Sequence, residues 1–451
     1  MLRTISHIRL VILVPLALLV AVFAASAATA APPIKAPKPD KDTAKAGQAA
    51  PATLPPGQAD KQKKQDALLP VAQELSDQAN AAGSDIAGVT IDVDGGTVDL
   101  YRKNPGKALG LSGAPTAGVK IQVHEAKFSR KELLDAADQV TRDAQALGQQ
   151  QVTVEAVGPK VDGSGIDVTV FAADGSDLTQ ATDVLKGKYG ALIHKVNGTD
   201  TKTSDKGDFV DGFRYNDFAP WYGGDRITDF SVGCSSGFAA TYNGAPAMLT
   251  AAHCGGVGGY WYNGPGTTGG HRYMGQMVYS DGGTDVAAIG VSSYSTRINV
   301  GYDPTAPWQI NVGSWASPIV GQYLCQSGAY TSERCSLYVV DTYQYVCRSY
   351  FLWWCTSWQG PLADVIGYSA GVPVVGHGDS GGPVYRYSYY NYSTGTWEGV
   401  AEGLVHAVLT PNAAAAYPAY AAAGDTQYCS SPFGWSYRCA PGFSFAHMPG
   451  Y

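Results

Sequence analysis

The sequence has 451 residues, of which 15% are charged, with 55 glycines and 28 tyrosines; this length indicates two or three domains, and this composition favours short strands and turns over long helices. The formal charge of −7 falls entirely on residues 205–451, which hold 9 Lys/Arg and 16 Asp/Glu, whereas residues 1–204 hold 22 of each. An acidic surface repels phosphate backbones, so we expect no nucleic-acid partner.

The chain begins with a pattern typical of an export signal. Arg3 and Arg9 precede an apolar run to about Ala25, and the small residues that follow, among them 28–30, fit a cleavage site. An uncleaved anchor is the alternative, because the run nearly reaches the roughly 20 residues that span a bilayer. Pro15 and the clustered alanines favour cleavage. We therefore predict a signal peptide over 1–30, a secreted protein and only transient membrane contact.

Residues 31–66 are rich in Pro, Ala, Lys and Gln and hold almost no large apolar side chain. Such a segment buries too little surface to offset the entropy lost on ordering. We predict a disordered linker here.

Residues 67–200 predict an α/β domain. A helix over about 66–82 precedes two strands that flank the turn at 94–96. Ser129 and Glu132 form a capping box that opens a later helix. After the hairpin, the predicted elements are a strand, a helix that begins at Ser129, two strands, a helix and a strand. They cover about 119–124, 129–147, 152–157, 166–171, 177–186 and 191–196. This order is typical of a split, ferredoxin-like domain.

The composition changes after residue 198. Residues 199–207 are polar and suit an exposed processing loop, and we expect processing between about 197 and 215. From there on, short apolar runs alternate with glycine-rich turns, which predicts an antiparallel sandwich or barrel.

All eight cysteines lie in this later half, which predicts disulfides formed in an oxidising compartment. Three pairs close short loops, and the remaining two cysteines are left to join each other. No Cys-x-x-Cys and no histidine pair on a helix face is present, so we expect no metal site and no cofactor. Eight cysteines permit 105 connectivities, among which we favour Cys325–Cys335, Cys347–Cys355, Cys429–Cys439 and Cys234–Cys254.

Three clusters in the later half carry residues suited to acyl transfer. His253 ends the stretch Thr-Ala-Ala-His-Cys, Asp285 precedes an apolar run, and Ser380 lies in Gly-Asp-Ser-Gly-Gly-Pro. A serine hydroxyl needs a neighbouring imidazole to accept its proton, and a buried carboxylate holds that imidazole in one tautomer. Glycines beside Ser380 let the amides of Gly378 and Ser380 point at one oxygen.

These motifs, in the order His, Asp, Ser, resemble the chymotrypsin superfamily of serine peptidases. Their spacing and the long amino-terminal region resemble its bacterial secreted branch, the streptogrisins and α-lytic-type peptidases. The resemblance, which covers about 215–410, implies an all-β chymotrypsin-like double β-barrel over 205–451. It implies that 67–200 is a pro-domain acting on its own peptidase in cis, and that the substrates are proteins or peptides.

The resemblance also implies the role of each residue. His253 is the general base, Asp285 its orienter and Ser380 the nucleophile, with the oxyanion bound by the amides of Gly378 and Ser380. Asp281 is the alternative to Asp285, but it lies in a glycine-rich turn typical of solvated residues. Asp379 is expected to pair with a newly freed amino terminus as an activation latch.

The predicted specificity pocket departs from the family. Val374 takes the place of the acid that selects basic residues, so a trypsin-like preference is disfavoured. His406 and Ala407 take the place of the Ser-Gly that lines this pocket. Glutamate-specific relatives use a histidine on this wall, which makes acidic specificity one hypothesis; a packing role for His406 and a preference for large apolar side chains are the others.

The leading functional hypothesis is a secreted serine endopeptidase made as a self-processed zymogen. The alternative is a catalytically inactive, protease-fold binding protein that retains its amino-terminal region as an adhesion module.

Overall fold

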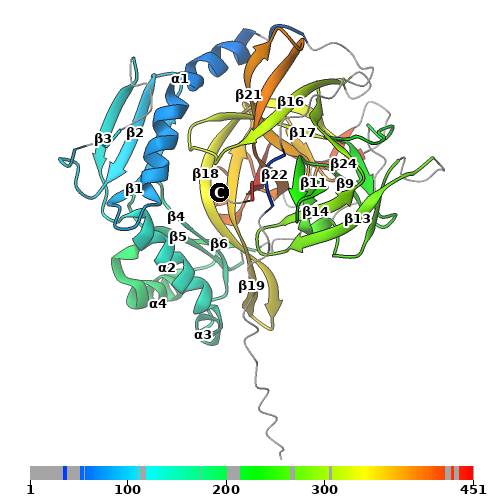
Figure 1. Ribbon diagram of the computed structural model, residues 1–451. Helices are drawn as coiled ribbons and strands as arrows, with labels where there is room; N and C mark the ends of the chain where they lie inside the picture. Colours follow the sequence, from blue (N-terminus) through cyan, green and yellow to red (C-terminus); the bar gives the residue numbers. More distant parts are fainter. Residues whose placement is uncertain are drawn as a thin grey trace, which may run out of the picture. The chain divides into compact units, whose positions relative to one another are not determined.

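Strands dominate the computed structural model (Figure 1). It describes residues 34–37, 51–54, 56–108, 110–111, 118–173, 175–200, 214–264, 270–303, 307–421, 428–430 and 436–449. The predicted signal peptide and most of the predicted processing loop lie outside these ranges. Residues 33–451 form one unit of contacts. None of the helices in the described ranges combines the length and apolar character needed to cross a bilayer.

The first elements are a long helix and a three-stranded sheet. Helix α1 (Pro56–Ala79) packs on strand β1 (Ile86–Asp92), which forms a hairpin with β2 (Thr97–Arg102). Gly96 in the hairpin turn has φ +66°, which a glycine adopts without steric cost. Strand β3 (Lys120–Glu125) then pairs in parallel with β2. The predicted hairpin is confirmed.

The predicted linker is ordered in several parts, so that prediction is wrong there. Helix α1 begins ten residues earlier than expected, and Ile34 and Leu54 are buried in a core cluster. Lys35 also exchanges two backbone hydrogen bonds with Thr241, of 3.0 and 3.1 Å. The low apolar content of the segment misled the prediction, because two isolated apolar side chains can anchor a chain on a surface that other segments build.

The next elements follow the predicted order but pair differently. Ser129 caps α2 (Arg130–Arg142) as expected: its amide donates to the Glu132 carboxylate at 2.7 Å. Along the chain then follow α3 (Ala144–Gln149), β4 (Val154–Pro159), β5 (Ile166–Phe171), α4 (Thr179–Tyr189), the short 3-10 turn η1 (Gly190–Leu192) and β6 (Ile193–Thr199).

These strands do not build the predicted ferredoxin-like sheet. Strand β3 pairs with β2, while β4, β5 and β6 lie in the order β6-β5-β4 and continue into the later half through β18. Helices α2 and α4 share a core cluster with β4 and β5. A strand's period-2 pattern identifies its buried face but not its partner, so the sequence predicted the strands and missed their pairing.

The later half begins with a seven-stranded sheet in the order β10-β11-β14-β13-β12-β8-β9. Within the described residues this sheet does not close on itself. Its strands are β8 (Arg226–Thr228), β9 (Gly233–Ser235), β10 (Ala239–Tyr242), β11 (Ala245–Ala251), β12 (Tyr260–Asn263), β13 (Arg272–Asp281) and β14 (Val286–Val291).

The following strands close into a barrel. Each of six strands pairs with two neighbours, in the ring β17-β18-β19-β25-β22-β21. The pairing thus closes one of the two predicted barrels. The ring consists of β17 (Tyr323–Gly328), β18 (Ser332–Phe351), β19 (Trp354–Ile366), β21 (Pro383–Asn391), β22 (Thr396–Val408) and β25 (Gly442–His447).

Shorter elements attach to this ring. Strands β15 and β16 continue from β22 to β7, and β20 pairs with β24, which pairs with β23. These elements are β7 (Trp221–Gly223), β15 (Tyr294–Val300), β16 (Trp308–Trp315), β20 (Val375–Gly376), α5 (Pro411–Ala416), β23 (Tyr428–Ser430) and β24 (Ser436–Ala440). One core cluster contains residues of both the seven-stranded sheet and the ring, among them Leu249 and Leu404.

Three predicted disulfides are confirmed: Cys234–Cys254, Cys325–Cys335 and Cys347–Cys355. Cys439 is also disulfide-bonded. The side chain of Cys429 lies outside the described residues, so its pairing with Cys439 stays a prediction.

Candidate active site

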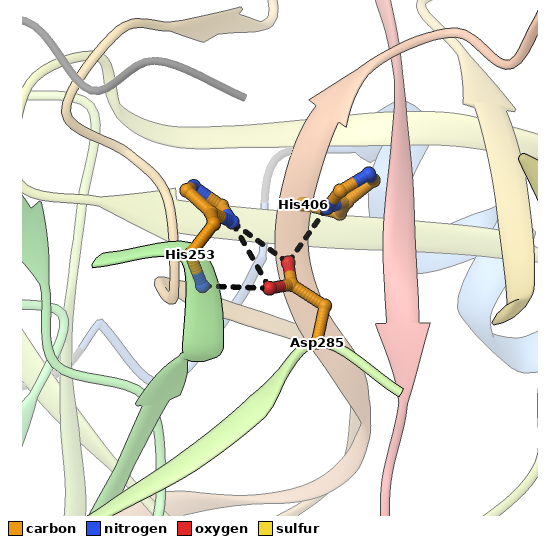
Figure 2. Close-up of side chains that lie close together, drawn as sticks. All are labelled: His253, Asp285 and His406. Carbon is orange, nitrogen blue, oxygen red and sulfur yellow. Dashed lines mark hydrogen bonds and ion pairs between the residues drawn. The ribbon is translucent and has the colours of Figure 1, made fainter. Parts of the chain in front are cut away.

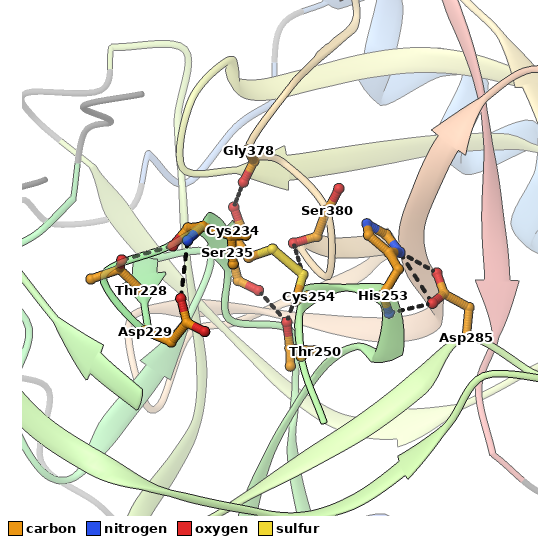
Figure 3. Close-up of a disulfide and its surroundings, with 12 residues drawn as sticks. Thr228, Asp229, Cys234, Ser235, Thr250, His253, Cys254, Asp285, Gly378 and Ser380 are labelled. Carbon is orange, nitrogen blue, oxygen red and sulfur yellow. Dashed lines mark hydrogen bonds and ion pairs between the residues drawn. A yellow bond between two sulfur atoms is a disulfide. The ribbon is translucent and has the colours of Figure 1, made fainter. Parts of the chain in front are cut away.

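His253 lies where the seven-stranded sheet meets the Cys234–Cys254 disulfide. Strand β11 ends at Ala251 and passes into the 3-10 turn η2 (Ala252–Cys254). The turn is fastened to β9 by the Cys234–Cys254 bond (Figure 3). The disulfide therefore limits how far the backbone of His253 can move.

Asp285 directly precedes β14 (Val286–Val291), and its side chain faces His253. Its φ of +58° is unusual for a residue other than glycine and costs on the order of 1–3 kcal/mol. Its carbonyl oxygen accepts the Ala252 amide at 3.1 Å, which holds the strained turn in place. Its carboxylate accepts the backbone N–H of His253 at 2.9 Å and the ring Nδ1 at 2.8 Å (Figure 2). The predicted pair is thus in contact.

The Asp285 carboxylate stays ionised although it is completely buried. Burial alone would raise its pKa, but the charges of His253 and His406 and the hydrogen bonds from both rings outweigh burial and hold the pKa below its usual range. A carboxylate accepts hydrogen bonds and donates none, so Nδ1 of His253 carries the proton. In its neutral form the imidazole then has a lone pair on Nε2, as a general base requires.

His406 is the second partner of the same carboxylate. Its Nδ1 lies 2.6 Å from Oδ2 of Asp285, and its ring lies 5.6 Å from that of His253 in an edge-to-face arrangement. The side chain is only 1% exposed. The side chain is turned toward Asp285, so Nδ1 is not available to a substrate carboxylate, and a role of His406 in the specificity pocket stays a hypothesis.

The loop that carries Ser380 is anchored on β9. The Ser235 amide donates to the Ser380 carbonyl at 2.8 Å, and the Ser235 hydroxyl donates to the Gly378 carbonyl at 2.9 Å. The Cys254 sulfur lies 3.9 Å from the Ser380 carbonyl oxygen. In the view of Figure 3, Nε2 of His253 is on the side of the ring that faces Ser380. No hydrogen bond joins the Ser380 hydroxyl to His253 in the described chain.

Glycines are required in this loop. Gly378 has φ +96°, and a Cβ there would meet the Tyr330 ring at 2.4 Å. Gly381 has φ +80°, and a Cβ there would meet the Thr250 hydroxyl at 2.2 Å. The amides of Gly378 and Ser380 donate to no acceptor in the part of the chain that the structure describes. Both are therefore available as donors to an incoming oxygen.

Asp379, the expected activation latch, is already hydrogen-bonded by its neighbours in the unprocessed chain. Its buried carboxylate already accepts hydrogen bonds from the amides of Gly376, Tyr330 and Thr331 and from the Thr331 hydroxyl, at 2.6–3.1 Å. A carboxylate offers about four lone pairs, and these four donors occupy them. In the unprocessed chain the loop is held by these neighbours, and the pairing of Asp379 with a freed amino terminus stays a prediction.

The other two predicted pocket residues lie apart: Val374 directly precedes β20, and Ala407 lies in β22. Val374 is 1% exposed and packs in an apolar cluster, and its carbonyl accepts the Gln326 side chain at 2.8 Å. Ala407 lies in β22 opposite Ser444 of β25 and is half-buried. Position 374 thus carries no carboxylate that could bind a basic substrate side chain. The contacts of Ala407 do not indicate which substrate side chain it would accept.

Two clusters of potential metal ligands occur in the described residues. One is formed by His253, Asp285 and His406, whose ligand atoms lie within 4.8 Å of one another. Nδ1 of His253 and Nδ1 of His406 are both already hydrogen-bonded to the Asp285 carboxylate. The other contains Cys325 and Cys335, which are joined as a disulfide. A metal ion would have to break existing bonds at either cluster.

Sequence reasoning missed the anchoring role of Ser235, the packing role of Tyr330 and the orientation of His406. One signal for His406 was present: it is the single ionisable residue in the apolar run from Leu404 to Leu409. A lone ionisable group in a buried strand requires a partner. The identity of that partner was not deducible from the sequence.

Neither a protein-family model nor a curated protein sequence matches this chain. Among solved structures, it is similar to the Nocardiopsis protease NAPase, with 21% identity and a TM-score of 0.32, over 50% of this chain and 91% of the other. It is similar to a glutamic acid-specific serine protease, with 20% identity and a TM-score of 0.32, over 49% and 92%. A third is the Cellulomonas bogoriensis chymotrypsin, with 19% identity and a TM-score of 0.31, over 50% and 90%. The structures that resemble half of this chain are thus bacterial chymotrypsin-like serine proteases.

Proposed function

We propose that this chain is a serine endopeptidase that cleaves peptide bonds with Ser380 as nucleophile, His253 as general base and Asp285 as the group that orients it. One observation carries the proposal. Asp285, in a strained and buried turn, binds both the amide and Nδ1 of His253, beside a loop that presents a serine and two unoccupied amides. A structural histidine does not require this combination.

The proposed reaction runs in two halves. The Ser380 oxygen attacks the carbonyl carbon of the scissile bond while its proton moves to Nε2 of His253. The carbonyl π electrons move to the oxygen, whose negative charge is stabilised by the amides of Gly378 and Ser380. The intermediate collapses, the C–N bond breaks, and the leaving amine takes the proton from His253. Water then repeats the sequence on the acyl-enzyme and releases the acid.

Asp285 stabilises the imidazolium that forms in each half. Its carboxylate keeps a negative charge 2.8 Å from Nδ1, and no water screens it because the side chain is fully buried. The carboxylate need not accept a proton itself.

The amino-terminal region supports a zymogen. Strand β4 extends the sheet of the peptidase half by pairing with β18, through Tyr345–Val157 and Val346–Ala156. Buried polar contacts cross the same boundary: Thr169 bonds Asn412 at 2.5 Å, and Asn412 donates to the carbonyl of Asp167 at 3.1 Å. A pro-domain that shares a sheet with its peptidase can guide the folding of that sheet, whose non-local pairings form slowly.

The test is activity-based labelling of the secreted protein. A fluorophosphonate probe is expected to modify Ser380, and Ser380→Ala is expected to abolish labelling, cleavage of an unfolded protein substrate and processing between about 197 and 215. Ser393→Ala, in the exposed turn between β21 and β22, is the matched control and keeps all three. A folded wild-type protein that neither labels nor cleaves would leave the inactive binding protein as the better hypothesis.

A further inference from the structure

We propose that His406 is a positioning residue of this site: its Nδ1–H fixes the Asp285 carboxylate in the orientation that serves His253. The inference rests on the proposed peptidase function and adds a fourth member to its hydrogen-bonded network.

The carboxylate is held from two directions. His253 supplies both of its donors from η2, through the amide to Oδ1 and through Nδ1 to Oδ2. His406 supplies a third donor to Oδ2 at 2.6 Å from β22, a strand of the closed ring. His253 and Asp285 belong to the seven-stranded sheet and its turns. His406 is therefore the group that ties the carboxylate to the other sheet (Figure 2).

Burial makes this donor difficult to replace. The side chains of His253, Asp285 and His406 are 5%, 0% and 1% exposed. Water has little access to Oδ2 if the ring is removed, and hydrogen bonds to an ionised group in a dry site are the strong ones. The carboxylate only accepts, so the proton of this bond belongs to Nδ1 of His406.

The surroundings of His406 contain a second acid. Asp364 on β19 interacts electrostatically with His406 and is itself held by the amide and hydroxyl of Thr410 at 2.9 and 2.7 Å. Asp285 and His253 thus face the His406 imidazole from the seven-stranded sheet, and Asp364 faces it from the closed barrel. A residue that only filled space would be expected to be apolar here, since its neighbours in β22 are Val405 and Ala407.

Three substitutions separate a hydrogen-bonding role from a packing role. Asn places its amide nitrogen where Nδ1 of histidine lies, Gln places it where Nε2 lies, and Leu keeps volume without a donor. We expect H406L and H406Q to lower kcat by roughly tenfold to a hundredfold with KM little changed, and H406N to recover most of that loss. His447→Leu, a buried histidine on β25 that packs against Tyr343, is the control and keeps kcat.

The pH profile gives a readout that packing does not move. Without the donor from His406, the Asp285 charge is less shared and stabilises the His253 imidazolium more strongly. The acid limb of kcat/KM in H406L is therefore expected at higher pH than in the wild type, with H406N between them. If all three variants lose kcat equally and keep the wild-type limb, His406 is a packing residue and the inference is wrong.

An NMR measurement makes the inference independent of activity. In full-length Ser380→Ala protein labelled with ¹⁵N-histidine, the His406 resonance, assigned by its loss in the H406N variant, is expected to show a protonated Nδ1. An unprotonated Nδ1 overturns the inference even if the wild type is an active peptidase. A protonated Nδ1 in a protein that no fluorophosphonate labels supports the hydrogen bond and rejects the peptidase function instead.

Discussion

Gln65 of α1 and Tyr323 of β17 exchange two hydrogen bonds across the boundary between the two halves of the chain. The Gln65 side-chain amide donates to the Tyr323 carbonyl at 3.0 Å, and the Tyr323 amide donates to the Gln65 side-chain oxygen at 2.9 Å. The glutamine, which is 1% exposed, thus satisfies backbone groups as a neighbouring strand would. It joins the amino-terminal region to the closed ring.

We expect Gln65→Leu to weaken this joint. The substitution leaves the amide and the carbonyl of the half-buried Tyr323 without these partners, at a cost of about 1–3 kcal/mol in the free energy of unfolding. Urea unfolding of the Ser380→Ala protein measures it without interference from proteolysis. Lys63→Ala, on the exposed side of the same helix, is the control, and equal stabilities of the two variants would contradict the expectation.

We expect the stability of the unprocessed protein to fall between pH 4.5 and 7 because of Glu402. Burial raises the pKa of Glu402 to about 7, although Arg386, at 3.0 Å, opposes the rise. In the unfolded chain the group titrates near 4.5, so within this window the folded state binds a proton that the unfolded state has released, and stability decreases as pH increases.

The measurement is the free energy of unfolding against pH. Glu402→Gln is expected to remove a decrease of about 1–3 kcal/mol over this range. Glu398→Gln, which changes a half-buried carboxylate on the same strand, is the comparison variant. Parallel curves for wild type and Glu402→Gln would show that Glu402 does not bind the proton.

Gly381→Ala is expected to destroy the site. The new Cβ would sit 2.2 Å from the Thr250 hydroxyl and 2.6 Å from the Ala251 amide, at a φ of +80°. Gly395→Ala is a matched control, with φ +66° and nothing within 4 Å of the new atom. The control costs about 1–2 kcal/mol for the left-handed backbone, and Gly381→Ala costs at least about 3 kcal/mol and removes fluorophosphonate labelling. Labelling that survives in Gly381→Ala would refute the geometry of this loop.

Asp285→Asn tests which acid orients His253. An asparagine offers an NH₂ group to the histidine and favours the wrong tautomer, so kcat is expected to fall on the order of 10⁴-fold while the protein stays folded. Asp281→Asn is the control, since Asp281 accepts the Gly283 amide within its own turn at 2.8 Å. Steady-state kinetics of both variants decide between them; a larger loss in Asp281→Asn would reverse the assignment.

Local features could be predicted from the sequence. The capping box at Ser129, the hairpin turn at Gly96 and the short-loop disulfides each involve residues close in the chain. The contact of His253 with Asp285 is long-range, but it was predictable from the resemblance of the motifs around His253 and Ser380. The hydrogen bonds of this contact were visible only in the structure.

The sequence by itself determined most helices and strands of residues 67–200 and which residue types gather in motifs, because hydrophobic period and capping act within a few residues. Only the tertiary structure decided that β3 joins β2, that β4 joins β18, and that His406 turns toward Asp285. These outcomes depend on the free energy of the whole assembly: a strand can pair with any compatible edge, and a buried polar side chain turns to whichever partner the fold brings near it.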